Sequence, residues 1–324
     1  MVDKRRKHIF ISEPEHGLPY SKGLTASSLM MTGLGPGRAY SVANKVERQL
    51  NAIGRVSISE EELRELTLEI LRGEAGDKYA EAFIKWQSVA ELDLPIIVLL
   101  GGTTGVGKST IATQLAYRLG ITRVVSTDAV REVLRSAFTP EMFPTLYASS
   151  FEADKAVRQP IPHSGDRLVI GFREQAAAVA VGAQALIDRA IAEGTDLIVE
   201  GAHLVPGFLE GVETVEAVIV PLLVVVDDED LHRSHFHWRS RDARPEDRYL
   251  KNFKKIRKLQ KYMTTSALMR GVPTISHYDL DATLSQIIDH VITKALEMVE
   301  RGAVVADKDE RLLERAVEAV GRKP

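Results

Sequence analysis

PIIVLLGGTTGVGKST, residues 95–110, joins an unbroken apolar run to a turn rich in glycine and hydroxyl groups. The run at 96–100 is typical of a strand buried on both faces, as at the centre of a parallel sheet. Residues 109–119 carry apolar side chains at helical spacing, and Gly120 follows them as a common helix stop. The sequence therefore predicts a glycine-rich turn between a buried strand and a helix.

A turn of this kind is suited to binding phosphate. The first N–H groups of a helix have no partner within it, and the helix dipole makes that end electropositive. The turn matches GxxxxGK[ST], in which the lysine reaches the outer phosphates of a nucleoside triphosphate and the hydroxyl coordinates magnesium. We predict that ATP and Mg²⁺ bind here, with Ser109 on the metal; the alternative is a tight glycine turn with a solvated lysine. The predicted nucleotide-binding residues are Gly102, Thr103, Thr104, Gly105, Val106, Gly107, Lys108, Ser109 and Thr110.

The composition is that of a globular protein and limits its chemistry. Of 324 residues, 44% are hydrophobic and 27% are charged, and the length allows about two domains. The net charge of -3 argues against nucleic-acid binding by the whole protein. Cysteine is absent, which excludes disulfides, cysteine-ligated metals and a thiol nucleophile. We expect a cytoplasmic protein.

We find no stretch of the sequence that is typical of a secretion signal or a membrane-spanning helix. The start, MVDKRRKHIFIS, is basic but lacks the apolar core of a secretion signal. The longest apolar run, residues 217–226, contains a proline and has about half the length that crosses a bilayer. We therefore expect no contact with membranes.

Three segments of the chain differ in pattern, and we predict domain boundaries between them. Residues 1–90 begin with a strand candidate at 8–12 and continue as helical patches, one of which starts with a capping-box pattern at Ser59 and Glu62. Residues 91–300 alternate strands with helices, which implies an α/β fold with a parallel sheet covered by helices. Residues 301–324 are predicted to form a charged helical tail. The strand candidates of the second segment are 96–100, 123–127, 197–199, 217–226 and 273–276.

Polar residues after the second of these strands are candidates for the acceptor site. Asp128 lies where side chains point into the ligand crevice of an open α/β sheet, so its carboxylate could accept or orient the proton of an attacking hydroxyl. Arg131, one helical turn later, could hold an anionic acceptor. Arg173, near the start of a long alanine-rich helix, is a further candidate for an anion contact. The alternative for Asp128 is that it only caps the following helix.

The next strand repeats this arrangement. The apolar run at 197–199 delivers Glu200 to the carboxyl end of the sheet, where it could hold the magnesium shell through water or contact the substrate. Gly201 follows and would leave space for substrate. Alternatively, Glu200 is a buried acid that pairs with an arginine.

The strongest charge asymmetry lies at residues 233–261, which hold eleven Lys and Arg against three acids. In a phosphotransferase this pattern predicts a lid, in which Arg239, Arg241 and Arg244 close over the transferring phosphoryl group and exclude water. Arg241 is the catalytic candidate and the other two are substrate-binding candidates. The alternatives are a solvated basic helix face and a nucleic-acid contact.

Three histidines at the start of this basic segment raise the question of a metal site. His232, His235 and His237 have imperfect spacing for a single helical face. Neither a cysteine nor a nearby arrangement of carboxylates completes a coordination shell. We therefore expect no metal on these histidines.

Several of these motifs together resemble the archaeal-type 2-phosphoglycerate kinase family. They are GGTTGVGKST, STDAVREVLR, GFREQ, IVEGAHLVPG and the RxRxxRPEDRYLKNFKKIRKLQ segment, and the resemblance covers residues 95 to about 300. It implies a P-loop kinase that transfers the γ-phosphoryl of ATP to the 3-hydroxyl of 2-phosphoglycerate, giving 2,3-bisphosphoglycerate. Residues 2–71 resemble the ATP-cone domain that often precedes this kinase, and whether this one binds nucleotide stays open.

Other functions remain possible at this point. A P-loop kinase of another small metabolite, of a nucleoside or of a polynucleotide end would share the aspartate after the second strand. A non-catalytic ATP-sensing regulator would need neither Asp128 nor the basic segment. The expected partner is a small phosphorylated acceptor, without nucleic acid or membrane, and a homo-oligomer is compatible with the sequence.

Overall fold

The computed structural model describes residues 10–12, 18–54, 57–90, 92, 94–158, 160–163, 165–209, 214–239 and 246–300. The chain divides into two compact units, which adjoin in the sequence between residues 92 and 93. The predicted tail at 301–324 lies outside the described residues.

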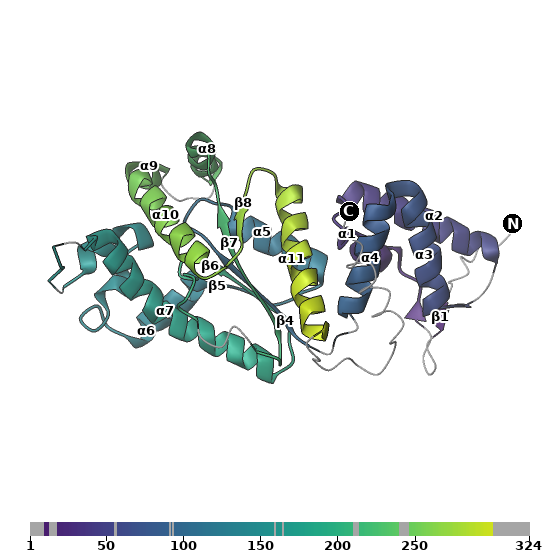
Figure 1. Cartoon of the computed structure of the whole chain (residues 1–324), viewed down its shortest axis with the longest axis horizontal. Coiled ribbons are helices and arrows are strands. Elements are labelled where there is room, and N and C mark those ends of the chain that lie inside the picture. The colour runs from purple at the N-terminus through teal and green to yellow at the C-terminus, as the bar shows by residue number, and fades with distance from the viewer. Residues whose placement is uncertain are drawn as a thin grey trace, which may run out of the picture. The chain divides into compact units, whose positions relative to one another are not determined.

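The first unit combines a small sheet with helices (Figure 1). Strand β1 (Phe10–Ser12) pairs antiparallel with β2 (Leu18–Pro19) and parallel with β3 (Ser57–Ser59). The predicted capping box is confirmed, because Ser59 Oγ accepts from the N–H of Glu62 at 3.1 Å and Glu62 Oε2 accepts from the N–H of Ser59 at 3.2 Å. The helices are α1 (Lys22–Met30), α2 (Pro36–Ile53), α3 (Glu60–Ala75) and α4 (Asp77–Ala90).

The second unit is built on the predicted parallel sheet, which is confirmed. Its strand order is β5-β6-β4-β7-β8, and every neighbouring pair is parallel. Strand β4, which leads into the glycine-rich turn, therefore lies at the centre of the sheet. The strands are β4 (Ile96–Gly101), β5 (Val124–Ser126), β6 (Leu197–Gly201), β7 (Val218–Val225) and β8 (Thr274–Ser276).

Helices cover both faces of this sheet (Figure 1). Helices α5 and α11 pack on one face, and α7 and α10 pack on the other. The helical segments of the unit are α5 (Lys108–Leu119), α6 (Thr127–Ala137), η1 (Pro144–Tyr147), η2 (Ser150–Ala156), α7 (Arg167–Ala192), α8 (Glu229–Arg239), α9 (Glu246–Lys251), α10 (Phe253–Met269) and α11 (Leu280–Glu300).

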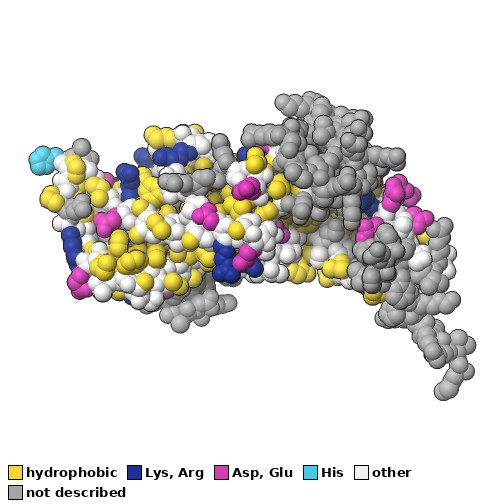
Figure 2. All heavy atoms as spheres, turned by 90° about the horizontal axis from the view of Figure 1, so that it is seen from below, with side chains coloured by type: hydrophobic (Ala, Val, Ile, Leu, Met, Phe, Trp, Pro, Cys, Tyr) yellow, Lys and Arg dark blue, Asp and Glu magenta, His cyan; other side chains and the backbone are white. Residues whose placement is uncertain are grey.

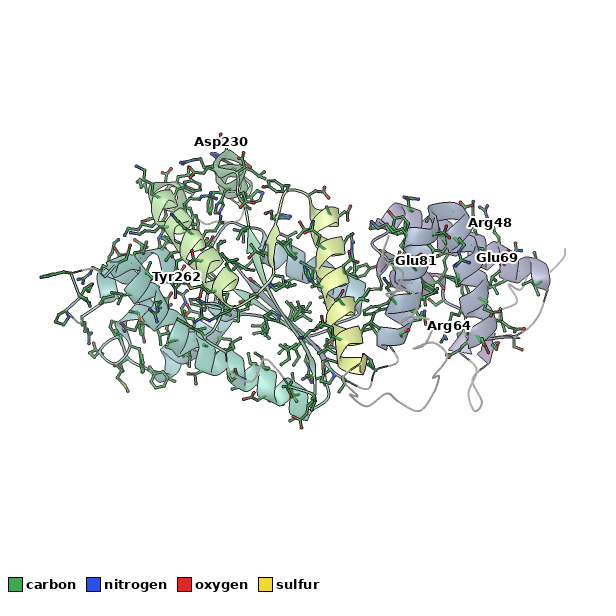
Figure 3. The ribbon with its side chains drawn as sticks, in the orientation of Figure 1. Arg48, Arg64, Glu69, Glu81, Asp230 and Tyr262 are labelled. Atoms are coloured by element: carbon green, nitrogen blue, oxygen red, sulfur yellow. The ribbon has the colours of Figure 1, made fainter. Side chains whose placement is uncertain are left out.

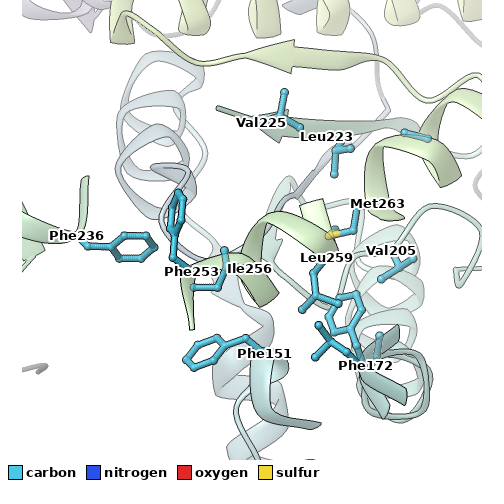
Figure 4. Packing of buried hydrophobic residues seen from close by; sticks show 13 residues of the cluster. Phe151, Phe172, Val205, Leu223, Val225, Phe236, Phe253, Ile256, Leu259 and Met263 are labelled. Carbon is cyan, nitrogen blue, oxygen red and sulfur yellow. The ribbon is translucent and has the colours of Figure 1, made fainter. Parts of the chain in front are cut away.

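An aromatic cluster connects α8 and α10 to the rest of the unit (Figure 4). Phe236 of α8 and Phe253 of α10 are buried with ring centroids 6.4 Å apart, and Phe172 of α7 is completely buried. Tyr262 extends from α10 toward α7 and meets Phe172 edge to face (Figure 3). Burying a side chain of this size stabilises the fold by about 1.5–3 kcal/mol. The cluster therefore fixes α8 close to the glycine-rich turn.

The surface carries charges of both signs. Figure 2 shows acidic and basic side chains scattered among apolar ones on the face that it draws. In the first unit, Arg48, Glu69 and Glu81 are exposed on α2, α3 and α4, and in the second unit Asp230 is exposed on α8 (Figure 3). Every helix in the described part of the chain is too short or too polar to span a lipid bilayer.

Candidate active site

The glycine-rich turn follows β4 and ends where α5 begins, as predicted. Gly107 takes the N-cap position of α5 in a left-handed conformation, with a φ of 87°. Gly102 has a φ of 148°, and a Cβ there would lie 2.4 Å from the carbonyl oxygen of Val224 in β7. Both positions need a backbone conformation or a close approach that glycine alone permits. We call residues 102–107 the phosphate loop.

Three successive carbonyl oxygens of the phosphate loop accept hydrogen bonds from side chains. Lys108 Nζ donates to the Thr103 carbonyl at 2.9 Å, and Lys108 is itself buried. His232 Nε2 lies 3.0 Å from the Thr104 carbonyl, and His235 Nδ1 lies 2.8 Å from the Gly105 carbonyl. The oxygens that would repel an anion are thus engaged by donors from α5 and α8.

Helix α8 also packs directly on the phosphate loop. A Cβ on Gly105 would lie 2.4 Å from the ring of Phe236, and Gly105 has a φ of 93°. His232 stacks on Phe236 with centroids 5.5 Å apart. The described residues hold no group of three or more His, Cys, Asp or Glu arranged to bind a metal. The sequence left the histidines of α8 without a role, and the structure places two of them as partners of the phosphate loop.

Ser109 and Glu200 meet across the first turn of α5 and the end of β6. Ser109 Oγ donates to Glu200 Oε1 at 2.9 Å, and Glu200 is 8% exposed. Among the described residues no arginine pairs with Glu200, and the side chains of Arg239, Arg241 and Arg244 lie outside them. A hydroxyl and a carboxylate are oxygen ligands of the kind that Mg²⁺ prefers. These two side chains fit a magnesium ion bound by Ser109 directly and by Glu200 through water.

A cavity of about 320 Å³ opens beside this pair. Its walls include the side chains of Ser109, Thr113 and Ser126 together with Glu200. A second cavity, of about 440 Å³, contains neither Ser109 nor Glu200 and is lined instead by residues such as Leu209, Arg270 and Lys294. The smaller cavity is therefore the one that belongs to the predicted site.

Asp128 lies in the first turn of α6, and its side chain is 69% exposed. The alternative that it serves as the helix cap is wrong. Ser126 is the N-cap, since its Oγ accepts from the N–H of Ala129 at 3.1 Å. Ser126 takes this position because it ends β5 in an extended conformation, whereas Asp128 already has its backbone in the helix. The exposed carboxylate is accessible to a ligand.

Arg131 lies beside Asp128, with Nη2 3.4 Å from Asp128 Oδ1. Its Nη1 donates to the Ala148 carbonyl at 2.7 Å, while its Nε is buried without a partner among the described residues. The guanidinium is thus positioned by η1 and α6 and still has an unused donor. Contact with an anionic acceptor stays a prediction.

A buried network runs behind Asp128 through Thr127, His203 and Gln175. Gln175 Nε2 donates to the carbonyls of Thr145 and Ala148, so its Oε1 must accept from His203 Nε2 at 3.2 Å. His203 Nδ1 is then unprotonated and accepts from the Thr127 hydroxyl at 2.9 Å. This network ties the segment after β6 to α6, α7 and η1.

His203 is buried and neutral. Its pKa is lowered to about 4, chiefly by desolvation; the Asp128 carboxylate opposes this shift, and the Arg131 and Lys108 cations add to it. Sequence reasoning missed this residue and Gln175, because a histidine near a candidate acid has no signature that separates a buried link from a surface side chain. For His232 and His235, the spacing of three residues on α8 was a usable signal of one shared face.

The prediction for Gly201 is wrong. The sequence indicates that it leaves space for substrate, but a Cβ at this position would lie 1.7 Å from Thr127 Oγ1. The space is therefore filled by Thr127, which approaches to reach His203. Gly201 is required by packing between β6 and α6.

The predicted arginines are only partly described. Arg173 is exposed on α7 and makes no hydrogen bond or ion pair in the described part of the chain. The backbone of Arg239 ends α8, its side chain is not described, and Arg241 and Arg244 lie outside the described residues. From the same basic segment, Arg248 of α9 reaches Ser149 Oγ at 2.7 Å and Glu152 Oε2 at 2.5 Å. The roles assigned to the predicted arginines stay predictions.

Comparisons with known proteins give close relatives over nearly the whole chain. No family model matches the sequence. The 2-phosphoglycerate kinase of Pyrococcus horikoshii is 39% identical over 87% of this chain and 93% of its own length. Those of Methanothermobacter thermautotrophicus and Thermococcus kodakarensis are 36% and 37% identical, over 90% and 89% of this chain and 96% and 97% of their own lengths.

Solved structures share a weaker likeness. A shikimate kinase from Acinetobacter baumannii is 17% identical, covers 67% of this chain and 99% of its own, and has a TM-score of 0.34. A gluconokinase from Sinorhizobium meliloti is 12% identical, covers 64% of this chain and 95% of its own, and has a TM-score of 0.33. The curated relatives, by contrast, exceed a third in identity along both chains. This chain therefore belongs to the 2-phosphoglycerate kinase family.

Proposed function

We propose that the chain transfers the γ-phosphoryl group of ATP to the 3-hydroxyl of 2-phosphoglycerate, giving 2,3-bisphosphoglycerate and ADP. Membership of a family whose relatives carry this acceptor in their name supports the acceptor. The observation that supports Mg·ATP as the phosphoryl donor is the hydrogen bond of 2.9 Å between Ser109 and Glu200, beside the phosphate loop.

On the donor side, the N–H groups at the start of α5 and the Lys108 ammonium bind the outer phosphates of ATP. Ser109 and Glu200 hold Mg²⁺, which supplies positive charge to the phosphate oxygens when it is bound. Lys108 must first leave the Thr103 carbonyl, to which it donates at 2.9 Å. That carbonyl lies five residues from Lys108 in sequence, so the exchange is a local side-chain movement.

On the acceptor side, the 3-hydroxyl oxygen attacks the γ-phosphorus as the bond from that phosphorus to the β–γ bridging oxygen breaks. Asp128 orients the hydroxyl and takes its proton. The exposure of its carboxylate fits this role. Arg131 neutralises the charge of the acceptor from its place beside Asp128, where its Nη2 lies 3.4 Å from Asp128 Oδ1. The attacking oxygen thus gives up its proton to Asp128 and receives the phosphoryl group from ATP.

2-Phosphoglycerate carries a carboxylate and a phosphate, about three negative charges near neutral pH, and must approach ATP closely. We assign Arg173 to a contact with the acceptor, and Arg239 and Arg244 to closing over it. Arg241 stabilises the transferring phosphoryl group. The basic composition of residues 233–261 supports this assignment.

For the N-terminal unit, we propose an ATP-cone-like domain. Its three-stranded sheet and four helices support the proposal. If the domain binds nucleotide, equilibrium dialysis should find two adenine nucleotides per chain, and Lys108→Ala should leave one. A single nucleotide that is lost in Lys108→Ala would instead show that the unit has no nucleotide of its own.

We further propose that the enzyme works in the cytoplasm, because ATP and a phosphorylated acceptor are metabolites that do not cross membranes unaided. Its partners are these small molecules, without nucleic acid or membrane.

The acceptor is tested by an ADP-release assay with a panel of hydroxyl compounds. The specificity constant for 2-phosphoglycerate should exceed those for glycerate and for nucleosides by at least about 100-fold, roughly 2.7 kcal/mol. Acceptors without the phosphate leave guanidinium groups unpaired in a closed site, which is why they should be rejected. Comparable rates with glycerate or a nucleoside would indicate a kinase of another metabolite, and ADP production that no acceptor raises would indicate an ATP sensor.

A further inference from the structure

Helix α8 presents two histidines, one turn apart, to two successive carbonyls of the phosphate loop. His232 meets the Thr104 carbonyl and His235 meets the Gly105 carbonyl. Each uses a different ring nitrogen, Nε2 for His232 and Nδ1 for His235. The two contacts are therefore chemically distinguishable, although the residue type is the same.

The surroundings of His232 determine its tautomer. Arg257 Nη1 lies 3.5 Å from His232 Nδ1, and this cation also donates to the carbonyls of Val226 and Asp227 at 2.5 and 2.8 Å. A nitrogen that faces a guanidinium carries a lone pair, so the proton of the ring is on Nε2 and is donated to Thr104. Desolvation lowers the pKa of His232 to about 4, which keeps the ring neutral.

His235 lies next to another ring of the site, His277, with centroids 5.8 Å apart. The Thr283 hydroxyl donates to the Asp279 carbonyl at 2.7 Å, so it accepts from His277 Nδ1 at 2.8 Å. His277 in turn lies 3.1 Å from the position that a Cβ on Gly107 would occupy. Rings from α8 and from the segment after β8 thus border the phosphate loop.

Because the peptide bond is planar, a hydrogen bond to a carbonyl of the phosphate loop also fixes the N–H group that follows it. In a trans peptide the C=O and the following N–H point in opposite directions. A donor that holds the Thr104 carbonyl therefore also fixes the direction of the Gly105 N–H, and a donor on the Gly105 carbonyl fixes the direction of the Val106 N–H. Glycine at 105, with a φ of 93°, would otherwise allow the adjoining peptides to rotate.

We propose that His232 and His235 are positioning residues, which aim the N–H groups of the phosphate loop at the nucleotide by holding its carbonyls from the opposite side. The inference rests on the proposed use of ATP and does not depend on the acceptor. His232 acts through Nε2 and His235 through Nδ1. Neither touches the reacting atoms.

The choice of ring nitrogen gives a reciprocal test. The side-chain amide nitrogen of glutamine replaces histidine Nε2, and that of asparagine replaces histidine Nδ1. In the full-length protein, H232N should weaken Mg·ADP binding by at least about tenfold (roughly 1.4 kcal/mol), and H232Q should recover most of the affinity. At position 235 the order should be reversed: H235Q should bind Mg·ADP weakly, and H235N should recover most of the affinity. Affinity is measured by calorimetry and the melting temperature by circular dichroism.

Two variants serve as controls. H237N removes an exposed histidine from the same helix, and V291A removes buried volume from α11. Neither should change Mg·ADP affinity, although V291A should lower the melting temperature. If Gln and Asn have equal effects at both positions, or if affinity falls only in proportion to the melting temperature, the histidines act by packing alone and the proposal is wrong.

A second readout does not use the nucleotide. Correlation spectra of the imidazole nitrogens in the free protein should show His232 protonated at Nε2 and His235 protonated at Nδ1. The opposite tautomer at either position would overturn the assignment. A wild-type protein that binds Mg·ADP but does not phosphorylate 2-phosphoglycerate would contradict the proposed acceptor and leave this inference intact.

Discussion

Ser109 Oγ donates a hydrogen bond of 2.9 Å to Glu200 Oε1, although 91 residues separate the two side chains in sequence. The contact joins the first turn of the helix after the phosphate loop to the end of a neighbouring strand. It brings a hydroxyl and a carboxylate together at the edge of a cavity. Because both groups can bind magnesium, the pair predicts how the enzyme depends on that metal.

Glu200→Gln should raise the Mg²⁺ concentration needed for half-maximal activity by at least about tenfold, roughly 1.4 kcal/mol. The amide keeps the shape of the side chain and can still bond to Ser109, but it lacks the charge that orders the water shell of the metal. Titrating MgCl₂ at fixed ATP measures the effect. Glu216→Gln, at an exposed position of the same unit, is the control. An unchanged Mg²⁺ requirement would remove Glu200 from the metal site.

Lys108→Ala should reduce turnover to below about a tenth of wild type, a loss of more than roughly 1.4 kcal/mol in transition-state stabilisation. The lysine is the cation that the phosphate loop places against the outer phosphates. The fold should survive, because the contacts that the substitution removes, among them the hydrogen bond to the Thr103 carbonyl, are made by a side chain and not by the backbone of α5. ADP release measures turnover, and circular dichroism checks the fold. A folded variant with more than a tenth of the activity would argue against the phosphate site.

Asp128→Asn should lower turnover by about 100-fold or more and change the free energy of unfolding by well under about 1 kcal/mol. Stability is unaffected because Ser126, and not Asp128, caps the helix. Glu132→Gln, also exposed on α6, is the matched control and should keep its activity. Turnover equal to wild type in both variants would mean that Asp128 has no part in the chemistry.

Acid should destabilise the kinase unit, with the effect beginning near pH 6.5. The pKa of His203 and that of His232 are each lowered to about 4 in the folded state, from an ordinary value of 6.5. The unfolded chain therefore binds more protons below pH 6.5, and each histidine removes up to about 1.4 kcal/mol of stability per pH unit until the pH falls to its folded pKa. Above pH 6.5 the full stability is present.

His203→Gln should reduce this pH dependence by up to about 1.4 kcal/mol per pH unit, because the proton that His203 takes up on unfolding is no longer bound. Denaturant titrations at pH 7, 6 and 5 measure it, with the exposed His163→Gln as the control for removal of a histidine. A slope that is the same in His203→Gln as in wild type would show that His203 does not titrate in this range.

The sheet was predictable because its three central strands are apolar runs that end in glycine or polar residues. The run at 96–100 and the glycines after it were enough to place β4 and α5, and the fold class is confirmed. The pairing of Ser109 with Glu200 could be expected in outline, since parallel strands bring their carboxyl ends to one edge. The distance itself needs the register of β4 against β6.

Contacts to backbone atoms could not be predicted from the sequence. His232 and His235 bind carbonyl oxygens, and every residue has a carbonyl, so no residue type marks the partner. Gly201 was misread for a related reason, because the side chain that fills its space comes from Thr127, more than seventy residues away. Asp128 was considered as a cap because Ser126, two residues earlier, was assigned to the strand.

The central place of β4 has a consequence for how the protein is made. On one side β4 pairs with β6, where Ile97 meets Leu197, and on the other with β7, where Ile96 meets Val218. A ribosome must therefore synthesise more than a hundred residues after β4 starts before either edge is covered. Until then an apolar strand with two open edges is exposed to other nascent chains. The strands and helices of the first unit, in which β1 pairs with β3, emerge earlier and can fold while the second unit is still being translated.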